Sequence, residues 1–259
     1  MPPKSVRRIV YLAITLLAPS PLAAQINIES LRREDPPPGL SGALGGDLNI
    51  TTGNVDLVQI NLNARLTRVS GTLTELLIGQ GGLGFLGRNR FATSGLVHYR
   101  QTYRVTDWVG PEWYVQTDYD RALLLDLRAL VGSGLRFDFA RGSWGRFGAG
   151  LSIMLEHERL NLPETAVHDA KTTTIRNSTF VTLRVVPGEH LVISSTTYVQ
   201  PTFADPTGDT RVLENLRIAT ALTERLDLTV TFDARYDSGP PDGISGLDTR
   251  LRMGVTFSY

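Results

Sequence analysis

The C-terminal stretch LDTRLRMGVTFSY, residues 247–259, contains two kinds of side chain in strict alternation. Leu247, Leu251, Met253, Phe257 and Tyr259 fall on one set of alternate positions, and charged, hydroxyl or glycine residues fall on the other. A strand sends successive side chains to opposite faces, whereas a helix would mix the two sets. The stretch therefore predicts a β-strand with one apolar face and one polar face, ending in an aromatic residue.

The same period of two recurs along the rest of the chain. In 226–237, for example, leucine, valine, phenylalanine and tyrosine alternate with aspartate, threonine and arginine. The pattern predicts twelve strands, at 40–51, 55–69, 72–79, 90–104, 110–120, 122–139, 145–158, 171–186, 190–201, 210–222, 225–237 and 244–259. Most of these segments reach the ~9–11 residues that a tilted membrane strand needs.

Most connections between the expected strands alternate between short and long, as in an exported barrel with both ends in the periplasm. Two outer connections, at Thr52-Gly53-Asn54 and near Asp120, are short and do not follow this pattern. The longer, outer connections are 79–90, 158–171, 201–210 and 237–244. A soluble β-sandwich also alternates, but here the polar face carries full charges on strand after strand. We therefore expect an all-β chain in which 40–259 forms a single transmembrane antiparallel β-barrel of about 12 strands.

The N-terminus has the features of a cleaved export signal. Lys4, Arg7 and Arg8 precede an apolar run of ten residues at 9–18, and small residues follow up to Ala24. The run is about half as long as the ~20 residues of a spanning helix. We expect 1–24 to be a signal peptide, 25–39 a periplasmic lead-in, and the mature chain to lie in the cell outer membrane.

Composition excludes several other classes of protein. The chain carries 26 basic and 26 acidic residues, so bulk charge does not favour a nucleic-acid partner. It has no cysteine, which removes disulfides, thiolate chemistry and the lipid-bearing cysteine of a lipoprotein. The expected partners are outer-membrane lipid and, during insertion, the barrel-assembly machinery. We expect a monomer.

Several short motifs occur in an order that resembles a known family. They are Leu40-Ser41-Gly42, Thr51-Thr52-Gly53-Asn54, Tyr119-Asp120-Arg121 and Tyr236-Asp237-Ser238-Gly239-Pro240-Pro241. Their order and spacing resemble those of the DUF481 or YdiY-like family, which consists of bacterial outer-membrane proteins of unknown function. Some members are called salt-induced. The family usually has a tryptophan near the start of the first strand, where this chain has Leu40. The resemblance implies an outer-membrane barrel and supplies no catalytic residues.

Catalytic and metal-binding arrangements find little support in the sequence. Ser94 and His98 lie four residues apart on one expected strand, hence roughly 13 Å apart and too far for a direct hydrogen bond. Glu156, His157 and Glu158 are consecutive, but adjacent strand residues point to opposite faces and could not share one ion. We expect no enzyme activity, no cofactor and no metal site.

Charged residues on the polar faces form the candidate site. The residues expected to line the lumen are Arg65, Arg128, Arg136, Asp138, Arg176, Arg184, Asp233, Arg235, Arg250 and Arg252. Two interpretations remain open: a charged constriction that selects solutes, and a lumen closed by ion pairs. In the first, the protein is a narrow channel whose arginines attract small anionic solutes. In the second, it is a non-conducting structural barrel, or one that binds partners through its outer loops. A barrel lipid hydrolase is a more distant alternative.

Aromatic residues cluster near the ends of the expected strands. Amphipathic rings favour the boundary between membrane and water. The expected interface residues are Trp108, Trp113, Trp144, Tyr236, Phe257 and Tyr259. Phe257 and Tyr259 also form the expected terminal signal for assembly.

Overall fold

The chain folds as an all-β protein, and the expected antiparallel barrel of 12 strands is confirmed. The computed structural model describes residues 28–32, 36–53, 56–188, 190–223 and 226–257. The strands are β1 (Gly39–Thr51), β2 (Leu57–Ser70), β3 (Leu73–Leu86), β4 (Asn89–Tyr103), β5 (Val109–Asp120), β6 (Leu125–Gly142), β7 (Gly145–Leu160), β8 (Lys171–Gly188), β9 (Leu191–Pro201), β10 (Thr210–Thr223), β11 (Leu226–Asp237) and β12 (Leu247–Phe257). The described helices are α1 (Ile28–Leu31) and a 3-10 turn, η1 (Arg121–Leu123).

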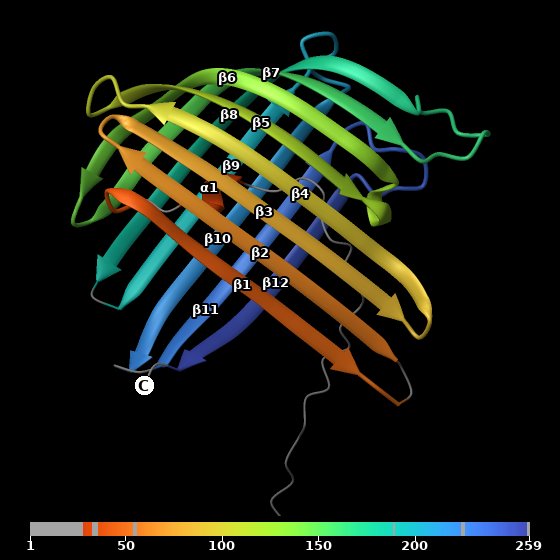
Figure 1. The fold of residues 1–259 in the computed structure, drawn as a ribbon, viewed down its shortest axis with the longest axis horizontal. Helices are drawn as coiled ribbons and strands as arrows, with labels where there is room; N and C mark the ends of the chain where they lie inside the picture. Colours follow the sequence, from red (N-terminus) through yellow and green to blue (C-terminus); the bar gives the residue numbers. More distant parts are fainter. Residues whose placement is uncertain (1–27, 33–35, 54–55, 189, 224–225, 258–259) are drawn as a thin grey trace, which may run out of the picture.

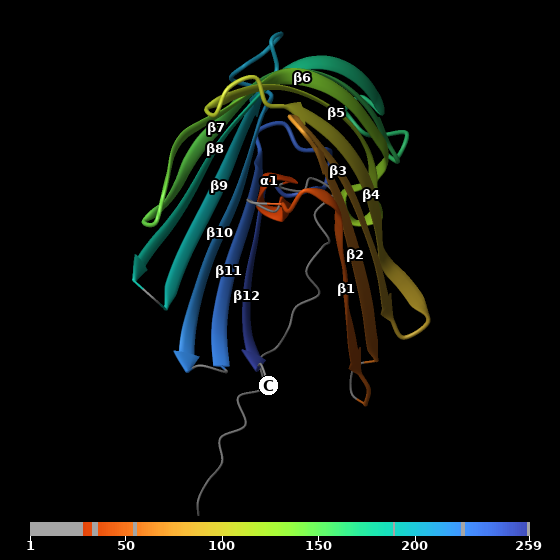
Figure 2. The same cartoon turned by 60° about the vertical axis from the view of Figure 1, so that its left-hand side comes forward.

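The strands form one sheet, in which each strand is hydrogen-bonded to the next along the chain. The sheet curls around a lumen, and α1 lies inside the curl (Figures 1 and 2). β1 and β12 are the two edge strands of this sheet (Figure 2). Neighbours in the sheet are therefore also neighbours in sequence.

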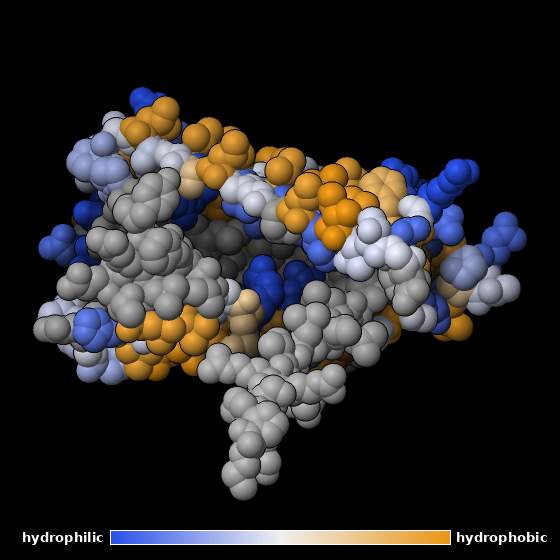
Figure 3. Space-filling model, turned by 90° about the horizontal axis from the view of Figure 1, so that it is seen from below, coloured by the Kyte–Doolittle hydropathy of each residue, from blue (hydrophilic) through white to orange (hydrophobic). Residues whose placement is uncertain are grey.

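The two faces of the sheet are the reverse of those in a soluble protein. Along β7, Leu151, Ile153 and Leu155 are 51%, 57% and 47% exposed, whereas Glu156 and Glu158 are 1% and 5% exposed. Figure 3 shows the result as a hollow with hydrophilic residues inside and bands of apolar residues along its outer rims. Soluble proteins rarely bury charges while exposing long apolar stripes. An apolar exterior around a polar interior suits a barrel surrounded by lipid.

The connections that follow even-numbered strands lie at one end of the barrel and are all short, whereas the longer loops lie at the other end, together with the shorter turns after β1, β3 and β5 (Figure 1). The longer loops are 161–170, 202–209 and 238–246. One expected outer loop is wrong: most of 79–90 belongs to β3 and β4, which meet at a two-residue turn, Gly87-Arg88. Gly87 has φ +58°, a conformation that glycine adopts without the steric penalty of a Cβ, and so the hairpin can close tightly there.

Four of the expected interface aromatics lie on the outside of the barrel. Trp108, Trp113, Trp144 and Tyr236 are 56%, 41%, 48% and 46% exposed. Phe257 is the last residue of β12, whereas Tyr259 and the expected signal peptide 1–24 lie outside the described residues. Of the expected lead-in 25–39, the described part includes α1. None of the helices in the described ranges is long and apolar enough to cross a membrane.

Candidate functional site in the lumen

The register of the hairpins places opposite charges side by side in the lumen. Arg128 on β6 lies opposite both Asp118 on β5 and Glu158 on β7. Glu156 and Glu158 are two residues apart on one strand, so both side chains point to the same face. Alternation along the strands and register between them are therefore sufficient to bring these charges together.

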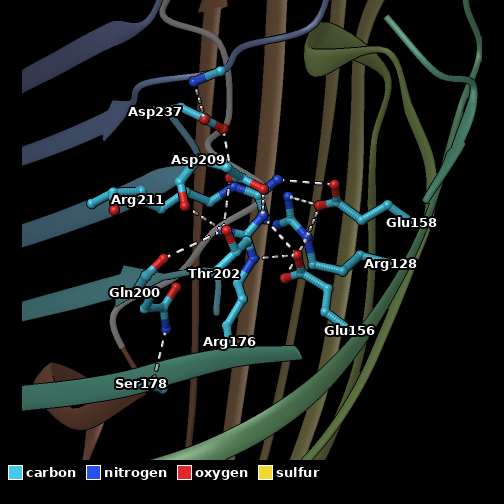
Figure 4. Close-up of polar contacts among 12 residues, drawn as sticks. Arg128, Glu156, Glu158, Arg176, Ser178, Gln200, Thr202, Asp209, Arg211 and Asp237 are labelled. Atoms are coloured by element: carbon cyan, nitrogen blue, oxygen red, sulfur yellow. Dashed lines mark hydrogen bonds and ion pairs between the residues drawn. The ribbon is translucent and has the colours of Figure 1, made fainter. Parts of the chain in front are cut away.

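Seven charged side chains form one connected cluster, the central network, and Figure 4 labels all of them except Asp118. Its members are Asp118, Arg128, Glu156, Glu158, Arg176, Arg211 and Asp237, and none is more than 5% exposed. Glu156 Oε1 lies 2.8 Å from both Arg176 Nε and Arg211 Nη1. Arg211 also contacts Glu158 at 2.9 Å and Asp237 at 3.0 Å.

The central network spans the lumen from the β6–β7 wall to β10 and β11 (Figure 4). Charges this deeply buried are stable only when they are paired and hydrogen-bonded, and the alternation of guanidinium and carboxylate groups provides that pairing. Beyond it, toward the longer loops, buried side chains form an apolar cluster: Leu123, Leu125 and Leu160, with Leu162 and Ile244 packed against them. Ion-paired and apolar side chains therefore fill this part of the lumen.

His98 lies in the lumen without a catalytic arrangement around it. Its Nδ1 is 3.0 Å from Gln116 Oε1, and its ring stacks on Tyr114 with centroids 5.8 Å apart. His157 is exposed and its Nδ1 lies 2.8 Å from Thr173 Oγ1, on the opposite face from the carboxylates beside it in sequence. Across the described ranges, no group of three or more histidine, cysteine or acidic side chains is placed to hold a metal ion.

The helix α1 is held inside the barrel by charge and by apolar contact. Glu29 Oε1 accepts a hydrogen bond from Arg136 Nη1 on β6 at 2.6 Å, and Oε2 accepts one from Arg100 Nη1 on β4 at 3.4 Å. Ile28 packs in a buried cluster with Leu76, Ile78 and Leu96.

The surroundings of Glu29 fix its charge. Burial alone would raise the pKa of this carboxyl, but the guanidinium groups of Arg136, Arg32 and Arg100 outweigh that effect and lower the pKa to about 2. Glu29 is therefore ionised at any physiological pH, and its charge offsets that of the arginines around it.

Between α1 and the short turns lies a cavity of about 700 Å³, which we call the arginine vestibule. Among the described residues, its charged lining is mostly basic: Arg32, Arg104, Arg136, Arg141, Arg146, Arg184 and Arg217, against Glu29, Asp107 and Asp138. Thr106 and Asp107, in the turn between β4 and β5, place the vestibule at the short-turn end. A concave surface with an excess of one charge concentrates small ions of the opposite charge. The vestibule is therefore suited to attract anions.

Six of the expected lumen residues lie in or beside the central network, at Glu29, or in the arginine vestibule. Arg128 and Arg176 belong to the central network, and Arg235 contacts it through Asp237 at 3.4 Å. Arg136 binds Glu29. Asp138 and Arg184 line the vestibule.

The remaining expected lumen residues lie near the edges of the sheet. Asp233 on β11 pairs with Arg252 on β12 at 2.8 Å, although the Arg252 side chain is 61% exposed. Arg250 lies opposite Asp233 in the register of these two strands. Arg65 lies on β2 two residues before the buried Thr67, hence on the same face.

Several important lumen residues were not among those expected. Arg100 and Arg211 lie on the lumen face of strands that were expected, and strict alternation along β4 and β10 would have included them. Glu29 carries no such signal, because a helix of four residues is too short to produce a sequence period. Its position becomes apparent only from the three-dimensional structure.

Comparison with known proteins gives a family and a fold. The model of the family described as "Protein of unknown function, DUF481" matches residues 44–259. No curated protein matches the chain. The structure is similar to the NanC porin, with a TM-score of 0.47 and 9% identity, over 84% of this chain and 99% of that chain. It is similar to the translocator domain of the autotransporter NalP from Neisseria meningitidis, with a TM-score of 0.40 and 11% identity, over 87% of this chain and 90% of that chain.

Proposed function

The chain belongs to the DUF481 family, and from that membership and the geometry of the lumen we propose that it is a narrow, anion-preferring channel of the bacterial outer membrane, closed in this conformation. The arginine vestibule carries the proposal, because it offers small anions a basic cavity of about 700 Å³ at one end of the barrel. Docked α1 and the central network close the path beyond it. In this proposal the protein acts as a monomer, surrounded by outer-membrane lipid, and performs no catalysis.

Conductance across a planar bilayer tests the proposal. The mature chain, refolded in detergent and checked for a heat-dependent gel shift, should give rare, small openings with a preference for anions. Replacing vestibule arginines, as in Arg184→Glu or Arg217→Glu, should lower the ratio of anion to cation permeability. Arg159→Glu, on an exposed position away from the vestibule, should leave that ratio unchanged. A folded barrel that never conducts would overturn the channel.

A second candidate, a non-conducting structural barrel, is favoured by the central network. A lumen crossed by buried ion pairs is suited to resist unfolding and does not require a pore. The double variant Glu156→Gln, Arg211→Gln separates the two candidates, because it removes opposite charges that lie 2.8 Å apart. A channel should open more often in this variant, whereas a structural barrel should lose stability and remain closed.

A further inference from the structure

Two buried arginines on different strands surround the Glu29 carboxylate. Arg100 on β4 and Arg136 on β6 are 4% and 9% exposed. Glu112, on the intervening strand β5, is 4% exposed and contacts Arg100 at 3.5 Å. We call Arg100, Glu112 and Arg136 the cradle.

The barrel carboxylates pair only loosely with the two arginines of the cradle. Glu112 lies 3.5 Å from Arg100, and Asp138, whose side chain is 39% exposed, lies 3.5 Å from Arg136. Glu29 approaches Arg136 to 2.6 Å, much closer than either barrel carboxylate approaches its arginine. Buried cations are stable only when closely paired, so an anion in the position of the Glu29 carboxylate stabilises the cradle.

The cradle also has hydrogen-bonding capacity that Glu29 does not use. Within the described part of the chain, Arg100 Nε, Arg136 Nε and Glu112 Oε2 are buried without a hydrogen-bond partner. Such groups are rare in folded proteins because each unmade bond costs free energy. Arg100 and Glu112 also line a cavity of about 40 Å³, together with Ile28, Tyr114 and Phe180. The site therefore has room and unsatisfied polar groups next to the bound carboxylate.

Glu29 is not part of the barrel wall, so it can leave the cradle without unpairing any strand. It belongs to a four-residue helix outside the sheet, and it reaches the cradle from within the lumen. The arginine vestibule is lined by both Glu29 and Arg136, so a small anion entering from the short-turn end reaches one arm of the cradle directly.

We propose that the cradle is a binding site for the carboxylate of a small organic acid, and that Glu29 occupies it as a tethered competitor in this conformation. The inference rests on the proposed function, since it names the solute class that the vestibule would collect. Arginine pairs match the planar, singly charged carboxylate well, and Glu112 beside them disfavours a doubly charged phosphate. The organic part would occupy the apolar pocket filled by Ile28, against Leu76, Ile78 and Leu96.

Calorimetric titration of the refolded mature chain in detergent tests the site without requiring conductance. The probes are butyrate, its uncharged analogue butyramide, and inorganic phosphate. Removing the tethered carboxylate with Glu29→Gln should raise the affinity for butyrate about tenfold or more, since a docked competitor lowers apparent affinity by the fraction of open sites. Butyramide and phosphate should show no comparable gain. Glu164→Gln, on an exposed loop, is the matched control and should behave like the parent protein.

A second substitution locates the gain in the cradle. Adding Arg136→Lys to Glu29→Gln keeps the charge but removes the planar fork, and should abolish most of the increase. An unchanged butyrate affinity in Glu29→Gln, or an equal gain for butyramide or phosphate, would overturn the proposal. The two hypotheses fail separately. A barrel that binds butyrate with the expected dependence on Glu29 but never conducts supports the cradle and contradicts the channel. A conducting barrel whose butyrate affinity does not depend on Glu29 contradicts the cradle alone.

Discussion

At the scale of single residues, Arg211 joins three carboxylates of the central network. It contacts Glu156, Glu158 and Asp237 at 2.8, 2.9 and 3.0 Å. Arg211→Met would leave these buried carboxylates with too few partners, and breaking a buried ion pair in this way costs about 3–5 kcal/mol. Urea unfolding in detergent, followed by tryptophan fluorescence, should show this loss in the free energy of unfolding.

Arg159 provides the control for Arg211. It faces Asp126 at 3.7 Å with both side chains about half exposed, at 50% and 48%. Exposed pairs contribute about 0–1 kcal/mol, so Arg159→Met should change the free energy of unfolding very little. Equal losses in the two variants would mean that burial of the network does not stabilise the fold.

Gly150 leaves space for an aromatic ring in the lumen. A Cβ added at Gly150 would lie 2.0 Å from the Phe180 ring, which itself packs on Tyr198 with ring centroids 5.1 Å apart. Because the ring is already packed, Gly150→Ala should destabilise the barrel by about 1–3 kcal/mol. The temperature of the heat-dependent gel shift should fall accordingly. Gly79→Ala, where a Cβ meets nothing within 4 Å, should leave it nearly unchanged; a matching fall there would contradict the steric explanation.

Docking of α1 should resist acid. The pKa of Glu29 is lowered from 4.5 to about 2 despite burial, because Arg136, Arg32 and Arg100 favour the charged form. A depressed carboxyl pKa contributes stability that is complete above the unfolded value and is lost as the pH falls toward the folded value. Docking should therefore persist at pH 5 and weaken between about pH 4.5 and 2.

A single reporter can follow this transition, since the chain has no cysteine of its own. A fluorophore on Pro36→Cys, at the vestibule wall, should change its anisotropy with a midpoint well below pH 4. The same label in Glu29→Gln should show a much smaller acid transition. A midpoint near 4.5 in the parent would show that the arginines do not hold the Glu29 carboxylate.

At the scale of elements, the two edge strands decide whether the barrel is sealed. Among the described residues, β1 pairs with β2 alone and β12 with β11 alone. Unpaired edges are costly in lipid, because their backbone groups have no water to bond. We therefore expect β1 and β12 to pair with each other in the membrane.

Cysteine crosslinking tests this seam. Leu44→Cys on β1, combined in turn with Thr249→Cys, Leu251→Cys or Met253→Cys on β12, scans three registers of the outward face. One combination should form a disulfide in native membranes, since directly opposed strand residues lie within bonding reach. Phe232→Cys with Leu251→Cys, which are paired in the sheet, is the positive control. If the control crosslinks and none of the three seam combinations does, the edges are not paired.

Alternation predicted most elements because the membrane imposes it on every strand. The expected 145–158 and 171–186 begin at the same residues as β7 and β8, whose lumen and outer faces differ sharply in polarity. The second half of β3 was not predicted because its glycines have no side chains and so show no alternation between polar and apolar faces. Its strand conformation is determined by hydrogen bonding to β2 and β4 instead. Arg128 was predictable from its strand face, whereas the role of Glu29 depends on where α1 docks.

At the scale of the whole molecule, the arginine vestibule and two closures follow one another along the lumen. The arginine vestibule lies at the short-turn end, α1 closes it, and the central network fills the lumen beyond. The first closure depends on a segment outside the sheet and the second on buried ion pairs between strands. In the proposed channel, opening the path therefore requires two different events, undocking of α1 and rearrangement of the network, so removal of α1 alone should enlarge the vestibule without producing full conductance.

Orientation in the membrane determines which compartment the vestibule faces. Barrels of this type keep short turns in the periplasm and long loops outside. A cysteine at Val167, 92% exposed in the loop between β7 and β8, should therefore react with a membrane-impermeant maleimide on intact cells. A cysteine at Asp107, in the turn between β4 and β5 at the vestibule mouth, should react only after the outer membrane is permeabilised. Labelling of Asp107→Cys but not of Val167→Cys on intact cells would reverse the orientation, and the vestibule would then collect anions from the medium instead of the periplasm.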